Sequence, residues 1–385
     1  MSDYQMFEVQ VSQVEPLTEQ VKRFTLVATD GKPLPAFTGG SHIIVQMSDG
    51  DNQYSNAYSL LSSPHDTSCY QIAVRLEENS RGGSRFLHQQ VKVGDRLTIS
   101  TPNNLFALIP SARKHLFIAG GIGITPFLSH MAELQHSDVD WQLHYCSRNP
   151  ESCAFRDELV QHPQAEKVHL HHSSTGTRLE LARLLADIEP GTHVYTCGPE
   201  ALIEAVRSEA ARLDIAADTL HFEQFAIEDK TGDAFTLVLA RSGKEFVVPE
   251  EMTILQVIEN NKASKVECLC REGVCGTCET AILEGEADHR DQYFSDEERA
   301  SQQSMLICCS RAKGKRLVNA WCWICSLPKP DVALSAPSPA SEDFTADIPA
   351  INCVMLPPSA HHASRKSAPA NCSAVSVSSA SSAVG

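Results

Sequence analysis

Four cysteines in the last third of the chain have a spacing that can hold a metal cluster. Cys270, Cys275 and Cys278 form the pattern C-x4-C-x2-C, and Cys308 follows after 29 further residues. Plant-type [2Fe–2S] clusters are bound by four thiolates with this spacing. Thiolate suits iron because both are soft and the metal stabilises the deprotonated sulfur. The pattern therefore predicts an iron–sulfur cluster.

The spacing leaves three points open. Cys268 lies two residues before Cys270, and only the x4 spacing favours Cys270. Cys309 is as good a fourth ligand as Cys308 on spacing alone. The alternative centre is a zinc site built from two C-x2-C pairs. These pairs would be Cys275 with Cys278 and Cys322 with Cys325.

Two turns in the middle of the chain predict a nucleotide site. The apolar run 116–119 reads as a buried strand, and a glycine-rich turn and a helix follow it. Glycine lets phosphate approach the backbone, and a helix N-terminus offers free N–H groups. A second turn lies where another strand meets a helix, and carboxyl ends of parallel strands are where α/β sheets bind ligands. The candidate residues are Gly120, Gly121, Gly123, Thr125 and Pro126 in the first turn, and Cys197, Gly198 and Pro199 in the second.

We expect pyrophosphate at residues 121–125 and nicotinamide beside Cys197, which is a candidate catalytic residue. The alternative for these residues is a tight turn without ligand and a buried core cysteine. A hydride carries two electrons and a [2Fe–2S] cluster accepts one, so a group that splits the pair is needed between them. A flavin does this.

The flavin site is expected in the first domain. Tyr58 can lie along the flavin ring, and the Ser59 hydroxyl, the second candidate catalytic group, can hydrogen-bond it. A glycine turn before a short helix can hold the phosphate. The alternative is that these are ordinary sheet residues. The candidate set is Asn56, Tyr58, Ser59, Arg75, Arg81, Gly82, Gly83 and Ser84.

The surrounding patterns indicate three domains of different architecture. Alternating apolar and polar runs with turn residues between them predict an antiparallel barrel over 1–108, interrupted by a helix near 84–90. Strands alternating with amphipathic helices, notably 179–188 and 200–213, predict a parallel sheet over 109–226. A polar linker at 227–234 leads to a cysteine-bearing domain at 235–320, which opens with a hairpin at 235–248. Residues 321–385 are rich in Ser, Ala and Pro, and this composition predicts disorder.

Composition excludes some classes of function. The formal net charge of −16 argues against a nucleic-acid partner, because phosphate binding needs clustered Lys and Arg. No apolar run of eighteen residues and no signal-like start are present, so we expect no membrane partner and a cytoplasmic location. Residues 245–300 contain 14 Asp or Glu against 5 Lys or Arg, so this stretch is the expected docking face for a basic protein.

Together the motifs resemble a known family. Residues 57–60 (Ala-Tyr-Ser-Leu), 120–126, 197–199 and 270–308 occur in the order found in reductase components of two-component Rieske oxygenases, of the phthalate dioxygenase reductase and vanillate demethylase reductase type. The resemblance covers residues 1–318. It implies a multidomain α+β protein with an FMN-binding β-barrel, an NADH-binding α/β domain and a β-grasp ferredoxin domain. It also implies Cys308 as the fourth ligand.

The resemblance implies an NADH-dependent oxidoreductase that passes electrons from NADH to FMN, to the cluster and to the Rieske oxygenase partner. Within the family, the chain is most similar to reductases that serve carnitine monooxygenases, which convert carnitine to trimethylamine and malic semialdehyde. An aromatic oxygenase of the vanillate type is the alternative partner. A flavin and iron–sulfur redox sensor without turnover is the alternative of a different class.

Two departures from the family stand out. Relatives commonly carry Arg where this chain has Asn56, which shifts phosphate binding onto Arg75, Arg81 or the Gly82–Gly83 turn and keeps FAD as the alternative flavin. Family members also stop soon after the position of Val318, whereas this chain continues to residue 385. We expect this extension to be a frameshifted or read-through end without a function of its own.

Overall fold

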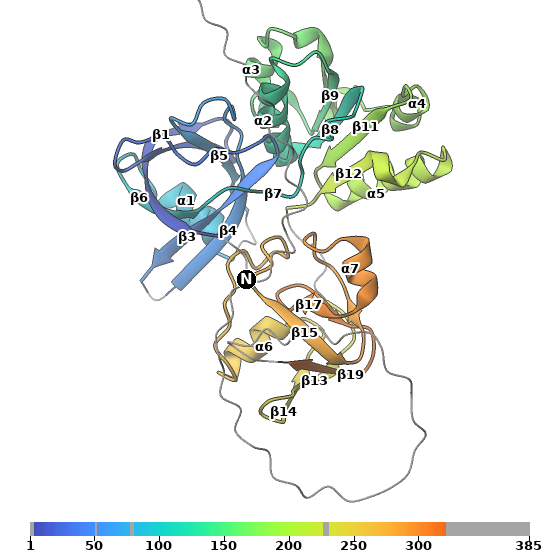
Figure 1. Ribbon diagram of the computed structural model, residues 1–385. Coiled ribbons are helices and arrows are strands. Elements are labelled where there is room, and N and C mark those ends of the chain that lie inside the picture. The colour runs from blue at the N-terminus through green and yellow to red at the C-terminus, as the bar shows by residue number, and fades with distance from the viewer. Residues whose placement is uncertain (1–3, 51, 78–80, 226–230, 321–385) are drawn as a thin grey trace, which may run out of the picture. The chain divides into compact units, whose positions relative to one another are not determined.

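The computed structural model describes residues 4–50, 52–77, 81–225 and 231–320, and these residues all belong to one compact unit. Most of the expected linker, the expected disordered end at 321–385 and the possible zinc ligands Cys322 and Cys325 lie outside the described residues. The described residues build three main sheets (Figure 1). None of their helices combines the length and the apolar character that a membrane crossing requires.

The first sheet is antiparallel and has seven strands, in the order β4-β3-β6-β1-β2-β5 with β7 beside β3. Its edge strands are β4 and β5, and no pairing recorded in the described part of the chain joins them, so the sheet is a near-barrel. The helix α1 (Gly83–Gln89) follows β5. The strands are β1 (Met6–Pro16), β2 (Val21–Ala28), β3 (Ser41–Asp49), β4 (Asn52–Ser59), β5 (Tyr70–Arg75), β6 (Arg96–Ser100) and β7 (Asn103–Asn104).

Alternation along these strands builds the core of the near-barrel. In β1, Val9 and Val11 are buried while Gln10 between them is exposed, as expected for a strand with one face in water. Val9 and Val11 pack with Phe24, Ile43 and other apolar residues in one cluster. The expected antiparallel flavin-type domain is confirmed.

The second sheet is parallel, in the order β10-β9-β8-β11-β12. Its strands are β8 (Lys114–Gly120), β9 (Asp140–Ser147), β10 (Val168–His172), β11 (Thr192–Cys197) and β12 (Leu220–Glu223). The order places β8 and β11 side by side, and they pair in register from Thr192 with Lys114 to Cys197 with Ala119. The two predicted ligand turns therefore leave the sheet at the same edge.

Helices cover both faces of this parallel sheet (Figure 1). Phe117 belongs to one apolar cluster with Phe127 of α2, whereas Leu116 belongs to another with Leu185 of α4. This division follows from the alternation of side chains along β8. The helices are α2 (Thr125–Leu134), α3 (Arg156–Val160), α4 (Leu181–Ala186) and α5 (Glu200–Arg212). The α/β domain is confirmed, although α4 is shorter than the helix expected at 179–188.

The third sheet is mixed, in the order β14-β13-β19-β15-β17. Only β13 and β19 are parallel, and α6 (Ile254–Asn260) packs its buried side into the same core. This mixed sheet with its helix is the expected β-grasp ferredoxin domain. The strands are β13 (Phe235–Leu239), β14 (Lys244–Val248), β15 (Glu279–Glu284), β17 (Ser304–Leu306) and β19 (Arg316–Ala320). A small pair, β16 (Ala287–Asp288) with β18 (Arg311–Ala312), and the helix α7 (Asp296–Ser301) complete the domain.

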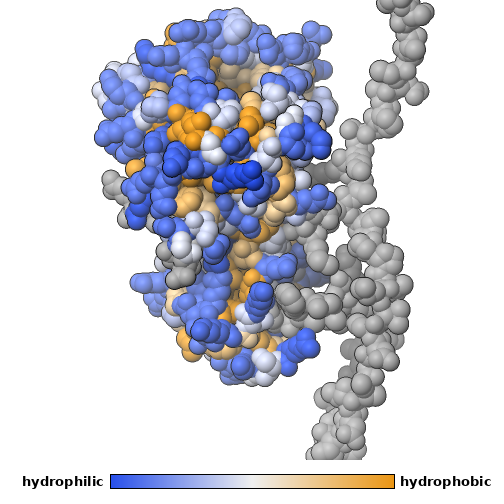
Figure 2. All heavy atoms as spheres, turned by 90° about the vertical axis from the view of Figure 1, so that its left-hand side faces the viewer, coloured by the Kyte–Doolittle hydropathy of each residue, from blue (hydrophilic) through white to orange (hydrophobic). Residues whose placement is uncertain are grey.

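One face of the molecule is mainly polar. On the face drawn in Figure 2, hydrophilic residues cover most of the area and apolar residues form smaller patches between them. Exposed large apolar side chains among the described residues include Leu105 and Phe225. Both of these side chains line one small cavity, which is part of the candidate site.

Candidate functional site

The cysteine loop after α6 brings Cys270 and Cys275 together. Both side chains are buried, and the backbone N–H of Cys270 donates to Cys275 Sγ at 3.4 Å. Glu272 N–H donates to Cys270 Sγ at 3.4 Å, and Thr277 Oγ1 lies 3.0 Å from Cys275 Sγ. Backbone N–H groups thus already point at these sulfurs, which is the arrangement that stabilises metal-bound thiolates.

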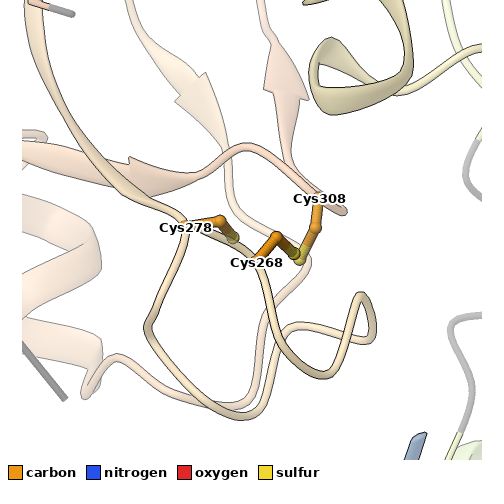
Figure 3. Close-up of side chains that lie close together, drawn as sticks. All are labelled: Cys268, Cys278 and Cys308. Carbon is orange, nitrogen blue, oxygen red and sulfur yellow. The ribbon is translucent and has the colours of Figure 1, made fainter. Parts of the chain in front are cut away.

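A second group of sulfurs contains Cys278 and Cys308. Their Sγ atoms and that of Cys268 all lie within 4.8 Å of one another (Figure 3). Cys309 is buried beside them, but its Sγ contacts Leu306 O and Ser310 Oγ, each at 3.7 Å. The geometry therefore favours Cys308 over Cys309, the point that spacing left open.

Glycines give the cysteine loop its shape. Gly273 and Gly276 both have φ of +73°, in the left-handed region that favours glycine. A Cβ at Gly276 would lie 2.4 Å from the ring of Tyr293, and one at Gly273 would lie 2.8 Å from Cys309 Sγ. Only glycine allows the loop to pack this closely against residues 291–293.

Arg271 fastens the same loop to α6. Its guanidinium donates to both carboxylate oxygens of Glu259, at 2.9 and 2.5 Å. This is the bidentate geometry of strong charge-assisted pairs. Because Arg271 stands beside Cys270, the Arg271–Glu259 pair holds Cys270 in place relative to α6.

The sulfurs are prepared for deprotonation within each group. The thiol of Cys270 donates a hydrogen bond that lowers the pKa of Cys275 to about 6. Hydrogen bonds from the thiols of Cys268 and Cys278 lower the pKa of Cys308. Metals bind the thiolate form, so each group offers one sulfur that ionises readily.

A small cavity of about 40 Å³ lies at the end of β4. The hydroxyls of Tyr58 and Ser59 are buried there without a hydrogen-bond partner, and burial raises the pKa of Tyr58. Unpartnered buried hydroxyls are costly unless a ligand pairs with them. A flavin ring offers such partners, so the residues fit it, although its size requires the cavity to widen. Its lining is His42, Ala57, Tyr58, Ser59, Leu105, Phe222, Glu223, Gln224, Phe225, Glu272, Val274 and Gln292.

The expected phosphate cradle is partly assembled. A Cβ at Gly83 would lie 2.3 Å from Asn56 Oδ1, and Gly82 has φ of +121° with the ring of Tyr54 close by. Asn56 thus lies beside the glycine turn. The turn fits a close approach of phosphate to the backbone.

The two candidate arginines are engaged with carboxylates. Arg81 pairs with Glu272 at 2.5 Å, and Arg75 pairs with Glu77 at 3.5 Å. Ser84 Oγ accepts from Glu77 N–H at 3.3 Å. Each guanidinium has five N–H donors, so either arginine can contact a phosphate while it keeps its carboxylate.

The two nucleotide turns pack directly against each other. A Cβ at Gly123 would lie 2.3 Å from Cys197 O, and one at Gly120 would lie 2.8 Å from Pro199. Gly121 has φ of +56°, and nothing lies within 4 Å of the Cβ position, so its outer side is open. The open side of this turn fits a pyrophosphate.

Three further candidates of the nucleotide site are packed into the turns themselves. The Thr125 hydroxyl donates to Ile122 O at 3.1 Å, so it closes the turn. Pro126 is buried within α2, and Gly198 packs against Gly120. These three residues shape the turns.

Sequence reasoning missed Glu223. It ends β12, pairs in register with Cys197, and lies with Oε2 4.0 Å from the Cys197 thiol. Burial raises the pKa of Glu223 to about 8, and burial and this carboxylate raise the pKa of Cys197. The rule that ligands bind at carboxyl ends of parallel strands also applies to β12. This rule could have identified Glu223, and also Phe225, which lies two residues after the end of β12.

Comparisons with known proteins agree with this arrangement. Residues 237–313 match the 2Fe-2S iron-sulfur cluster binding domain, and residues 100–220 match the N-terminal domain of dimethylamine monooxygenase subunit DmmA-like proteins. The chain is 99% identical over 318 residues to the carnitine monooxygenase reductase subunit of Escherichia coli (strain K12), a match that covers 83% of this chain and 99% of the relative.

More distant relatives match this chain over a similar share of its residues. The phthalate 4,5-dioxygenase oxygenase reductase subunit of Pseudomonas putida is 37% identical over 312 residues, covering 78% of this chain and 93% of the relative. The solved structure of phthalate dioxygenase reductase, described as modular for electron transfer from pyridine nucleotides to [2Fe-2S], is 33% identical with a TM-score of 0.65. It covers 82% of this chain and 98% of that one.

Proposed function

Because the chain belongs to the family of oxygenase reductase subunits that includes phthalate dioxygenase reductase, we propose that it carries electrons from NADH through FMN and a [2Fe–2S] cluster to a carnitine monooxygenase. The observation that carries the proposal is the near-identity to a carnitine monooxygenase reductase subunit along that relative's whole length. The three sites built from the residues of this chain supply a place for each group.

The cluster would be held by Cys270 and Cys275 on one side and by Cys278 and Cys308 on the other. A cluster of this type takes up and releases one electron at a time. The loop glycines and the Arg271–Glu259 pair hold the sulfurs in place before metal arrives. Preorganisation of this kind lowers the cost of binding.

For the flavin, Tyr58 and Ser59 would pair their buried hydroxyls with the ring, and the Gly82–Gly83 turn with Asn56, Arg75, Arg81 or Ser84 would hold the phosphate. A flavin accepts a hydride and gives up single electrons. Ser59 positions the acceptor, and the surrounding apolar side chains exclude water. The likeness to phthalate dioxygenase reductase supports FMN over FAD.

For the nucleotide, the open outer side of Gly121 would receive the pyrophosphate, and Cys197 would lie beside the nicotinamide. Cys197 is fully buried and its pKa is raised, so it stays a neutral thiol that donates toward Glu223. Both groups therefore position a ligand by packing and hydrogen bonding, without carrying charge into the site at neutral pH.

The remaining assignments are also proposals. The domain limits are 1–108, 109–226 and 235–320, with the linker at 227–234 and the extension at 321–385. The ten described cysteines are all free thiols, which supports a cytoplasmic location because thiols stay reduced there. The oxygenase partner is of the Rieske type.

Two measurements test the proposal. Anaerobic NADH titration of the purified protein, with iron, sulfide and flavin quantified, is expected to bleach flavin and cluster absorbance in sequence. Mixing with the oxygenase component and carnitine is expected to yield trimethylamine in proportion to the NADH consumed. More product per NADH with a vanillate-type oxygenase and its own substrate than trimethylamine per NADH with the carnitine oxygenase would favour the aromatic partner. Negligible NADH-dependent cytochrome c reduction would instead indicate a sensor without turnover.

A further inference from the structure

A third sulfur stands beside the pair that would bind one iron. Cys268 comes from the loop that precedes the first ligand, and its Sγ lies within 4.8 Å of the Sγ atoms of both Cys278 and Cys308 (Figure 3). A four-thiolate cluster needs two protein sulfurs on each iron. Cys268 is therefore one sulfur more than this iron requires.

We propose that Cys268 is a reserve ligand, able to take the place of Cys278 or Cys308 on the iron that these two cysteines share. The proposal rests on the assignment of a [2Fe–2S] cluster to this domain. In the exchange, the Cys268 thiol releases its proton to water and its sulfur forms the new iron bond. The sulfur that leaves takes up a proton, and no electron is transferred.

The sulfur of Cys268 needs to move only a short distance for this exchange. Tetrahedral metal sites have metal–thiolate bonds of about 2.3 Å, which places two sulfurs on one metal roughly 3.8 Å apart. Sulfurs within 4.8 Å of each other need a shift of only about 1 Å to reach that separation. A rotation of the Cys268 side chain with a small backbone adjustment covers such a shift.

The place of Cys268 in the chain permits this movement. It lies in an irregular stretch between α6 and Cys270, outside any helix or strand, and its side chain is partly exposed. The next residue, Leu269, donates its N–H to Thr277 Oγ1 at 2.9 Å, so the loop is fixed just after Cys268. Cys268 can therefore move while Cys270 keeps its position.

The reserve serves one iron only. Among the described residues, the group of Cys268, Cys278 and Cys308 is the one set of three potential ligands with atoms this close together. Cys270 and Cys275 pair with each other in a separate apolar cluster. Losing either of these two leaves their iron without a substitute.

Alanine variants of the full-length chain test this asymmetry, with iron and sulfide per chain and the EPR spectrum of the dithionite-reduced protein as readouts. C270A and C275A are expected to retain less than about a tenth of the wild-type iron. C278A and C308A are expected to retain more than about half, with shifted g-values because the sulfur on one iron has changed position. C268A alone is expected to match the wild type.

Double variants identify the substitute. C268A/C308A is expected to lose the cluster, whereas C308A/C309A is expected to keep it, because Cys309 contacts Cys308 but is not among the three sulfurs that lie within 4.8 Å of one another. Bound flavin in every variant serves as the control for folding of the remainder of the chain.

Three outcomes would overturn the reserve role. C308A and C278A could both be as empty as C270A, C268A alone could lose the cluster, or C268A/C308A could keep it. Each of these leaves the proposed function intact as long as the wild type holds two irons. A wild type without iron and sulfide after anaerobic purification would refute the proposed function itself.

Discussion

Glu223 is only partly exposed and lies at the carboxyl edge of the parallel sheet, where its carboxyl group neighbours the thiol of Cys197. Its pKa is raised by burial from 4.5 to about 8. Between these values the folded protein keeps a proton that the unfolded chain releases. The free energy of unfolding therefore falls as pH rises through this window, and the contribution of Glu223 is fully present only below pH 4.5.

The variant E223Q is expected to remove this dependence, since glutamine stays neutral at every pH. From pH 5 to pH 8 the wild type should lose up to roughly 4 kcal/mol more stability than the variant. Urea unfolding of flavin-free protein at several pH values measures the difference. The exposed Glu204 on α5 supplies the control E204Q, which should follow the wild type. Parallel pH curves for E223Q and the wild type would contradict the buried-carboxyl assignment.

Gly276 provides a second test at the residue scale. The variant G276A places a methyl group 2.4 Å from the Tyr293 ring at φ of +73°, so the cysteine loop must shift. We expect a cost of about 1–3 kcal/mol in stability of the ferredoxin domain and reduced iron content. Gly314 has open space at its Cβ position, and G314A is the matched control. Equal iron in both variants would show that the loop tolerates the change.

Single residues differ in how far the sequence could predict them. Spacing predicts Cys270, Cys275 and Cys278 as cluster ligands, because ligands that share one loop follow a fixed local spacing. It cannot decide between Cys308 and Cys309, since both are buried and only the direction of each sulfur separates them. It also cannot show that the Thr125 hydroxyl turns inward to Ile122 O.

At the scale of elements, β18 carries a buried arginine that ties distant segments together. The guanidinium of Arg311 is almost fully buried and donates to the carbonyls of Met252, Gly232, Asp233 and Pro249. These carbonyls lie at the entry to β13 and between β14 and α6. The Arg311 side chain therefore joins the end of the ferredoxin domain to the segments before β13 and after β14.

R311A is expected to lower the stability of the ferredoxin domain by about 3 kcal/mol, because four carbonyls lose the same charged donor and the segments that it joins come apart. Loss of cluster absorbance during heating reports the change. Arg316 on β19, which is more exposed and pairs with Glu245 and Glu284, gives the control R316A with an effect below about 0.5 kcal/mol. Similar midpoints for R311A and R316A would mean that water replaces the buried guanidinium.

Helices and strands with a clear periodic pattern of apolar residues could be predicted from the sequence, and those without such a pattern could not. The hairpin of β13 and β14 and the helix α6 follow directly from alternation and from the Thr253 capping box. The short pair β16 and β18 has two residues in each strand, too few to show any period. Its existence depends on contacts between distant segments, which Arg311 illustrates.

At the scale of the whole molecule, the excess of acidic residues is the feature most relevant to a protein partner. Three consecutive carboxylates, Asp296, Glu297 and Glu298, are exposed at the start of α7. Exposed charge of one sign speeds the encounter with a surface of the opposite sign, and salt screens the effect.

We expect the second-order rate of electron transfer to the oxygenase to fall at least about fivefold as ionic strength rises from roughly 0.02 to 0.3 M. Stopped-flow mixing of reduced protein with the oxidised oxygenase measures this rate. Flavin reduction by NADH within the same protein is the internal control. A rate that does not respond to salt would rule out steering by α7 and its neighbours.

The extension beyond the ferredoxin domain allows a further test. Deletion of residues 326–385 is expected to leave iron content, flavin content and trimethylamine formation unchanged, because every candidate site residue lies before this segment. Purification of the shortened chain and assay with the oxygenase measure all three. Loss of transfer to the oxygenase with full cofactor content would show that the extension binds the partner.

The position of β19 has a consequence for biosynthesis. This last described strand lies in the interior of its sheet, between β13 and β15. During translation, β13, β14, β15 and β17 are made before β19. Until β19 is made, the place between β13 and β15 in the sheet is empty. The sheet closes only after residue 320 has left the exit tunnel. We therefore expect iron and sulfide to be inserted only after β19 has completed the sheet that carries the cysteine loop.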